Sequence, residues 1–184
     1  MKKSSYKDWN PGLSNGKKTL AEMKKTLPAN SPDDISRIVR LLENPASPVA
    51  LKGAVTLERH DAIHIVLGRG LLPQDEAFVI GFTMGTAKNI RKWEEFLFKG
   101  VSMYIYPKIY RFSRKHMKAY DLGLSYGKKC KVKKIYEFPF ENCDHMKLNE
   151  LRKILGIDVT ELRKIYEKEK ELLADTKCSK RLDV

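Results

Sequence analysis

Apolar residues recur every three or four positions through most of this 184-residue chain, and helix-capping or helix-breaking residues separate the runs. This spacing places apolar side chains on one face of an α-helix. Ser31-Pro32 and Asp158 are typical of helix starts, and Gly68 and Gly156 are typical of helix ends. The pattern predicts an all-α fold, a single compact multi-helix domain.

The expected helices follow from these boundaries. We expect a short helix within 19–27 and longer ones over 31–44, 48–67, 75–99, 101–126 in two pieces, 144–155 and 158–173. Residues 127–141 contain a glycine and a basic cluster, which favour an irregular or extended connection. The expected organisation is a basic, loosely ordered leader over 1–30, the helical domain over 31–173 and a flexible tail over 174–184.

The charge of the chain predicts an anionic partner. Lys and Arg number 36 against 23 Asp and Glu, a net charge of +13, which attracts nucleic acid, anionic lipid or phosphorylated substrates. Three scattered cysteines are too few for a disulfide framework and indicate a reducing cytoplasm. The uncharged run at 77–87 is about half the ~20 residues that a membrane span needs. We therefore expect a cytoplasmic protein that is peripheral to the membrane, and an organellar leader stays open.

A candidate metal site lies at the end of the helix expected over 48–67. His60 and His64 are four residues apart and share a helix face with apolar residues. Asp61 can reach the same centre from the flank, as a metal ligand or as a proton acceptor. Because imidazoles and a carboxylate facing a dry interior are costly without a compensating charge, we expect a divalent cation between them.

Glu76 is the fourth expected ligand. The turn at 68–73 is predicted to reverse the chain and to bring the first turn of the next helix beside the histidines as an antiparallel neighbour. Two imidazoles and two carboxylates suit zinc, our first candidate, and also iron(II), manganese or cobalt. The alternative is a buried histidine pair that binds no metal and is satisfied by backbone carbonyls and by its own contacts.

His60-Asp61-x-x-His64, eleven residues and then Glu76 resembles the metal motif of the "coenzyme Q four" family of ubiquinone-biosynthesis proteins. The similar stretch at 60–85 reads HDAIHIVLGRGLLPQDEAFVIGFTMG, and weaker similarity covers about residues 31–157. The resemblance implies an all-α fold and a divalent metal held by His60, Asp61, His64 and Glu76. It also implies a polyprenylated aromatic lipid as substrate and other quinone-biosynthesis enzymes as partners at a membrane.

The activity that this resemblance implies is metal-dependent decarboxylation at ring position C1 of a polyprenylated hydroxybenzoate, with oxidative replacement by hydroxyl. Asp61 is the expected catalytic residue. A first alternative is a non-catalytic organiser that binds isoprenoid lipid, with a structural metal. A second is nucleic-acid binding through the basic segments 111–118 and 128–134, although the chain contains no recognised nucleic-acid module. A homodimer stays open, since Gly81-x-x-x-Gly85 permits close helix approach.

Overall fold

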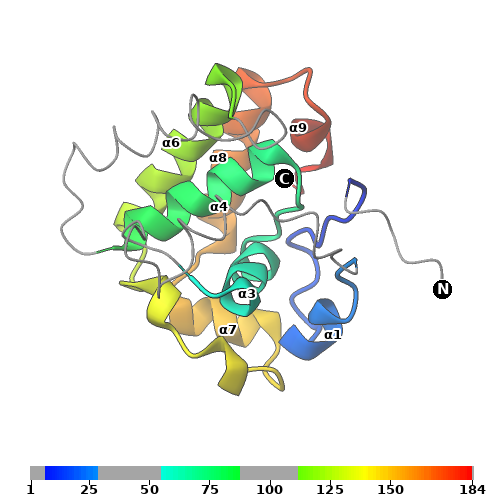
Figure 1. Ribbon diagram of the computed structural model, residues 1–184, viewed down its shortest axis with the longest axis vertical. Coiled ribbons are helices and arrows are strands. Elements are labelled where there is room, and N and C mark those ends of the chain that lie inside the picture. Colours follow the sequence, from blue (N-terminus) through cyan, green and yellow to red (C-terminus); the bar gives the residue numbers. More distant parts are fainter. Residues whose placement is uncertain (1–6, 29–54, 88–111, 184) are drawn as a thin grey trace.

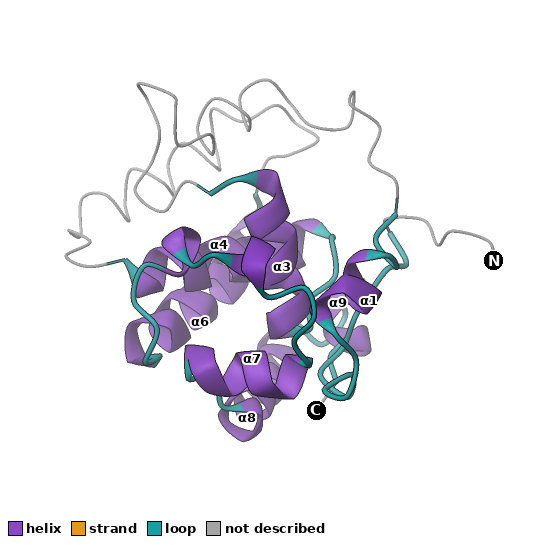
Figure 2. Ribbon diagram, turned by 90° about the horizontal axis from the view of Figure 1, so that it is seen from below, coloured by secondary structure: helices purple, strands orange, loops and turns teal. Residues whose placement is uncertain are grey.

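The computed structural model describes residues 7–28, 55–87 and 112–183. Within these ranges the chain is helical and has no strand, only an isolated backbone bridge between Thr19 and Lys147. The described helices gather into one body (Figure 1, Figure 2). The expected all-α single domain is therefore confirmed.

The described helices have the following bounds: α1 Leu20–Lys24, α3 Leu57–Leu67, α4 Pro73–Thr86, α6 Arg114–Lys129, the 3-10 turns η3 Ile135–Glu137 and η4 Phe140–Asn142, α7 Leu148–Leu155, α8 Val159–Leu172 and α9 Lys177–Arg181. The expected helix at 31–44, and the parts of other expected helices at 48–54, 88–99 and 101–111, lie outside the described residues.

Several helix boundaries follow local signals in the sequence. Asp158 caps α8, because its Oδ1 accepts hydrogen bonds from the backbone N–H groups of Thr160 and Glu161 at 2.8 and 3.3 Å. Gly68 and Gly156 end α3 and α7 with φ of 69° and 67°, a left-handed conformation that glycine adopts without a Cβ penalty. The ends expected at residues 67 and 155, and the start expected at 158, are confirmed.

Other boundaries differ from the expectation. α4 begins at Pro73, and Asp75 lies inside its first turn, where it accepts a 3.2 Å hydrogen bond from the Leu72 backbone N–H. The helix expected over 48–67 is not continuous, because residues 55–56 are not helical and α3 begins at Leu57. α6 continues through Gly127 to Lys129, so only the residues after it form the irregular connection.

α4 and α6 lie side by side and approach each other closely (Figure 1, Figure 2). Their contact is made by Gly81-x-x-x-Gly85 of α4 and Gly123-x-x-x-Gly127 of α6, where an added Cβ would clash with backbone carbonyl groups of the opposite helix. Gly81 meets Tyr120 and Gly85 meets Leu124, so the two helices run in the same direction. The glycine spacing of α4 therefore serves the packing of α4 against α6 within one chain.

α3 occupies the centre of the core. Every side chain from Ala62 to Leu67 has 0% exposure, so this part of the helix is buried on all sides. Side chains from later helices bind its C-terminal carbonyl groups. Arg152 of α7 donates from Nε to the Val66 carbonyl at 2.8 Å, and the Tyr166 hydroxyl of α8 donates to the Leu67 carbonyl at 2.5 Å. His64 therefore lies in a fully buried part of the fold whose backbone is held by later helices.

Residues 7–28 do not form the loosely ordered leader that the sequence predicted. Trp9, Leu13, Leu20 and Met23 are at most 4% exposed and belong to the main core. The Trp9 indole N–H also donates to the Thr26 hydroxyl at 3.0 Å. The short helix expected within 19–27 is present as α1, and it buries Leu20 and Met23. Trp9 and Leu13 lie outside helices, so they give no local periodic signal.

The expected flexible tail also differs from the structure. Residues 177–181 form α9, which buries Cys178 and is followed by the buried Leu182. Asp183 accepts hydrogen bonds from the backbone N–H groups of Leu13 and Ser14 at 3.0 and 2.8 Å. The two ends of the described chain are therefore bound to each other and to the core.

Candidate metal centre

The two histidines of α3 point at each other. Because they are four residues apart on one helix, His60 and His64 bring their Nε2 atoms within 3.0 Å. Their ring centroids are 4.7 Å apart. His64 is fully buried and His60 is 9% exposed. The pair therefore meets away from solvent, as the sequence predicted.

Glu76, in the first turn of α4, completes the cluster. Its Oε2 lies 3.0 Å from His60 Nε2, and its Oε1 lies 3.4 Å from His64 Nε2. Each carboxylate oxygen thus faces one imidazole. The predicted proximity of these three residues is observed. The helices that carry them are not the antiparallel neighbours that we expected. In Figure 1, α3 is seen almost end-on, whereas α4 runs across the view.

The backbone fixes the tautomer of His64. Its Nδ1 lies 2.8 Å from the Gly70 carbonyl oxygen, and a carbonyl can only accept a hydrogen bond, so Nδ1 carries the hydrogen. In the neutral ring Nε2 then presents a lone pair to His60 and Glu76. A metal-ligating histidine commonly donates its other N–H to a backbone carbonyl in this way.

The charges in the cluster are set by burial and by the histidines. Burial opposes ionisation of Glu76, but the charge and hydrogen bonds of His64 and His60 outweigh it and hold the pKa of the Glu76 carboxyl well below its ordinary value. Glu76 is therefore an anion. That lowering depends on positive charge and N–H donors on the histidine side of the carboxylate. A divalent cation would take the place of that charge, with both Nε2 atoms unprotonated and directed at the metal.

The spacing of the three donor atoms fits a metal. The nitrogen–nitrogen and nitrogen–oxygen separations are 3.0, 3.0 and 3.4 Å. Ligands bound at about 2.0–2.2 Å with tetrahedral or octahedral angles are separated from each other by about 2.8–3.6 Å. The donor set of two imidazoles and one carboxylate also matches that of catalytic zinc sites. The residues present therefore fit a divalent transition metal, with zinc as the first candidate.

Asp61 lies beside this cluster and is not part of it. Among the described residues, only His60, His64 and Glu76 place their donor atoms within 4.8 Å of one another. Burial raises the pKa of the Asp61 carboxyl, the positive charges of His60 and His64 oppose that rise, and the Glu76 charge adds to it. Asp61 is thus close enough to respond to the cluster electrostatically, although the structure does not bring it into the donor set.

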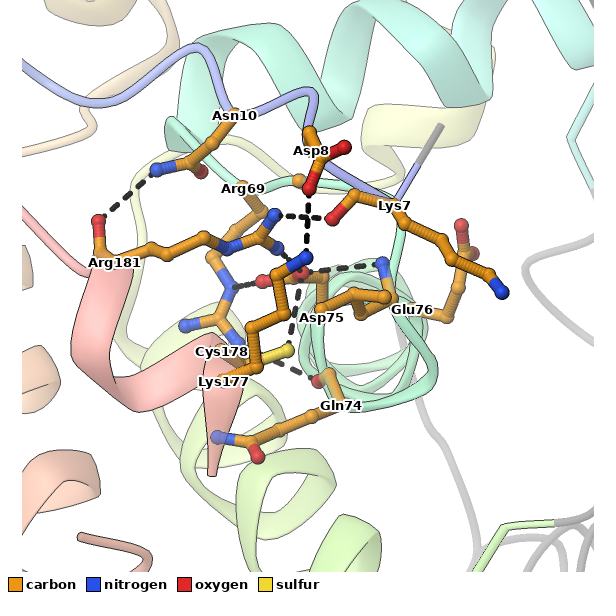
Figure 3. A network of polar contacts seen from close by, with 12 residues as sticks. Lys7, Asp8, Asn10, Arg69, Gln74, Asp75, Glu76, Lys177, Cys178 and Arg181 are labelled. Atoms are coloured by element: carbon orange, nitrogen blue, oxygen red, sulfur yellow. Dashed lines mark hydrogen bonds and ion pairs between the residues drawn. The ribbon is translucent and has the colours of Figure 1, made fainter. Parts of the chain in front are cut away.

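Sequence reasoning missed the groups that hold the turn between α3 and α4. Arg69 is fully buried and forms ion pairs with Asp75 at 3.1 Å and with Glu169 at 2.9 Å. Figure 3 shows Asp75 with Arg69, Arg181 and Cys178 around it. The sequence contains one indication of this buried ion-pair network, the single arginine between Gly68 and Gly70 in an otherwise apolar stretch. The role of the Gly70 carbonyl could not be predicted, because every residue has a backbone carbonyl and the residue types of a motif do not mark one.

No protein-family model, curated protein or solved structure matches the chain. Among the described helices, none is both long enough and apolar enough to span a membrane.

Proposed function

We propose that this protein is a metal-dependent enzyme of ubiquinone biosynthesis that decarboxylates a polyprenylated hydroxybenzoate at ring position C1. The observation that carries the proposal is the convergence of the buried His60 and His64 Nε2 atoms with the carboxylate of Glu76, whose side chain is 29% exposed at the edge of the core. The resemblance of residues 60–85 to the "coenzyme Q four" family supports the choice of substrate class.

A metal bound by three side chains keeps coordination positions for an exogenous ligand. When bound there, it would act as a Lewis acid toward charge that develops on a ring oxygen. In the proposed reaction the bond from the ring to the carboxylate breaks and CO₂ leaves. Dioxygen would be the oxidant: one oxygen atom enters the ring as hydroxyl, and the other becomes water, with two electrons from an external reductant and three protons, one of which completes the new hydroxyl.

The residues of this chain would hold and orient the reacting groups. His64, fixed by the Gly70 carbonyl, and His60 supply neutral donors, and Glu76 supplies one negative charge. The net charge of the centre with a divalent cation would be +1, which favours an anionic ring carboxylate. Asp61, beside the donor set, is the carboxyl that would accept a proton from the bound substrate.

The test is turnover of a polyprenylated hydroxybenzoate by the metal-loaded protein in the presence of dioxygen and a reductant. We expect CO₂ release and a hydroxylated ring product that both depend on His64. Metal-loaded protein that binds the lipid but never releases CO₂ would refute the enzymatic proposal.

A second candidate function is a non-catalytic protein that binds isoprenoid lipid and organises other quinone-biosynthesis enzymes. The position of Asp61 outside the donor set favours this candidate, since the residue expected to act on the substrate does not meet the metal ligands. In that case His64→Ala would weaken fold stability and lipid binding together, with no turnover in either protein.

A further inference from the structure

Gly70 is enclosed by three segments of the chain. Its carbonyl accepts the hydrogen bond from His64 Nδ1. A Cβ added at Gly70 would lie 2.7 Å from the Trp9 carbonyl oxygen, 2.8 Å from Arg181 Nη2 and 3.0 Å from Asp75 Oδ2. The group that orients His64 is therefore packed against the N-terminal segment, the first turn of α4 and the C-terminal helix α9.

Asp75 joins this turn to α9. Its Oδ2 accepts hydrogen bonds from the Leu72 backbone N–H at 3.2 Å and from Arg181 Nη2 at 2.9 Å, and its Oδ1 pairs with Arg69 Nε at 3.1 Å. The Asp75 side chain is 2% exposed, and that of Arg181 is 17% exposed. Arg181 thus supplies a cation, largely shielded from solvent, to the carboxylate that holds the turn (Figure 3).

The other side of the turn is fixed by Arg69. Its guanidinium forms two hydrogen bonds to Glu169 of α8, at 3.0 and 2.9 Å, and lies over the rings of Phe78 and Tyr166. Two groups of the C-terminal helix α9 bind Asp75 Oδ2, namely the Cys178 thiol at 3.2 Å and the Arg181 guanidinium at 2.9 Å. Arg181 is the one of the two that carries a positive charge.

We propose that Arg181 is a positioning residue of the metal centre and that the docking of α9 sets metal affinity. The chain of contacts runs from Arg181 to Asp75, from Asp75 to the turn, from Gly70 to His64 Nδ1, and so to the Nε2 donor. This inference rests on the proposed metal binding. Loss of an outer-shell partner commonly lowers metal affinity 10–100-fold, and we expect an effect in this range.

The test compares Arg181→Met with Lys177→Met in the full chain. Lys177 also lies on α9 and makes an ion pair, to Asp8 at 2.7 Å, but both side chains of that pair are more than half exposed, at 56% and 61%. Zn²⁺ affinity is measured by competition with a chromogenic chelator, and the melting temperature is measured on the metal-free proteins. We expect Arg181→Met to bind Zn²⁺ 10–100-fold more weakly than Lys177→Met, at metal-free melting temperatures that differ little.

Equal Zn²⁺ affinity in the two folded variants would overturn the proposal. Should Arg181→Met fail to fold, Gly70→Ala replaces it, because this change keeps every charged side chain while its Cβ presses on Arg181, Asp75 and the Trp9 carbonyl and so disturbs the same contacts. The ¹⁵N chemical shifts of the His64 ring report which nitrogen carries the hydrogen, and they do not depend on the stability of the fold. We expect a protonated Nδ1 in the wild type and loss of this protonated-Nδ1 shift in the variant. A protonated Nδ1 in Gly70→Ala, with wild-type Zn²⁺ affinity, refutes the inference. Absence of Zn²⁺ binding in the wild type instead refutes the proposed function.

Discussion

Three side chains and one backbone carbonyl define the candidate centre at the scale of single residues. The histidine pair could be predicted from the sequence because the four-residue spacing on a helix is a local property. Glu76 could be predicted because only a short turn separates it from the pair. Asp61 was misplaced for a geometric reason. Successive residues on a helix point about 100° apart, so Asp61 lies to one side of the point where His60 and His64 meet, and its short side chain does not join the donor group.

Metal binding depends on the histidines. We expect His60→Ala and His64→Ala to lose stoichiometric metal, and Glu76→Gln to bind more weakly than wild type while keeping an oxygen donor. At free metal 100 times the dissociation constant, bound metal adds about 2.7 kcal/mol to the free energy of unfolding. Adding a chelator should therefore lower the wild-type melting temperature by about 5–11 °C.

The matched control for these variants is His145→Ala, which alters an exposed histidine outside the cluster. It should retain one metal per chain and the full effect of the chelator. One metal per chain in the His60→Ala, His64→Ala double variant would exclude the site.

Asp61→Asn should separate chemistry from folding. If Asp61 accepts a proton, turnover should fall by about 10²–10⁴-fold, the usual effect of a positioned acid or base. Because burial raises the pKa of this carboxyl in the folded protein, ionising it costs folding free energy as pH rises from its unfolded pKa through its folded pKa. At neutral pH the neutral asparagine should therefore leave the melting temperature unchanged or slightly higher. Wild-type turnover in metal-loaded Asp61→Asn would remove the role that we assign to the residue.

At the scale of elements, helix ends were predictable and helix contacts were not. The cap at Asp158 and the glycines at 68 and 156 act within one turn of the chain, so the sequence around them is sufficient. The pairing of α4 with α6 joins residues about 40 positions apart. The glycine spacing in α4 was visible, but the matching spacing at Gly123 and Gly127 gained its meaning only when the two helices were seen in contact.

The α4–α6 interface should not tolerate a methyl group. Gly123→Ala places a Cβ against the Phe78 carbonyl, and overpacking of this kind costs about 1–3 kcal/mol. Alanine otherwise stabilises a helix interior by about 1 kcal/mol relative to glycine, so a net loss would identify the contact as its cause. Ser125→Ala, on the exposed side of α6, is the control and should leave the urea midpoint nearly unchanged. A Gly123→Ala protein more stable than wild type would contradict the close packing.

At the scale of the whole molecule, the two ends of the described chain are part of the core. Arg152 shows how this happens, because its guanidinium donates to the Val66 carbonyl of α3, to the Leu13 carbonyl and to the Asn15 side chain. One buried arginine thus joins α7, α3 and the N-terminal segment. Lysines dominate the composition of residues 1–30 and suggested a separate leader, whereas the structure is decided by a few apolar residues and by long-range hydrogen bonds.

The net charge of +13 predicts attraction to anionic surfaces. We expect peripheral binding to anionic membranes through exposed lysines, since each basic side chain near an anionic leaflet contributes about 1 kcal/mol. Replacing the exposed Lys129 and Lys131 by glutamine should therefore weaken binding by about 30-fold. The control replaces Lys177 and Lys180 of α9, which lies away from the C-terminal end of α6 in Figure 1.

Flotation with phosphatidylserine vesicles should fade as salt rises, because exposed charges are screened over about 8 Å at physiological ionic strength. Equal flotation with neutral vesicles at high salt would show that lysines do not attach the protein to the membrane. Equal weakening by both pairs of substitutions would show that attachment follows the total charge rather than the surface around Lys129 and Lys131.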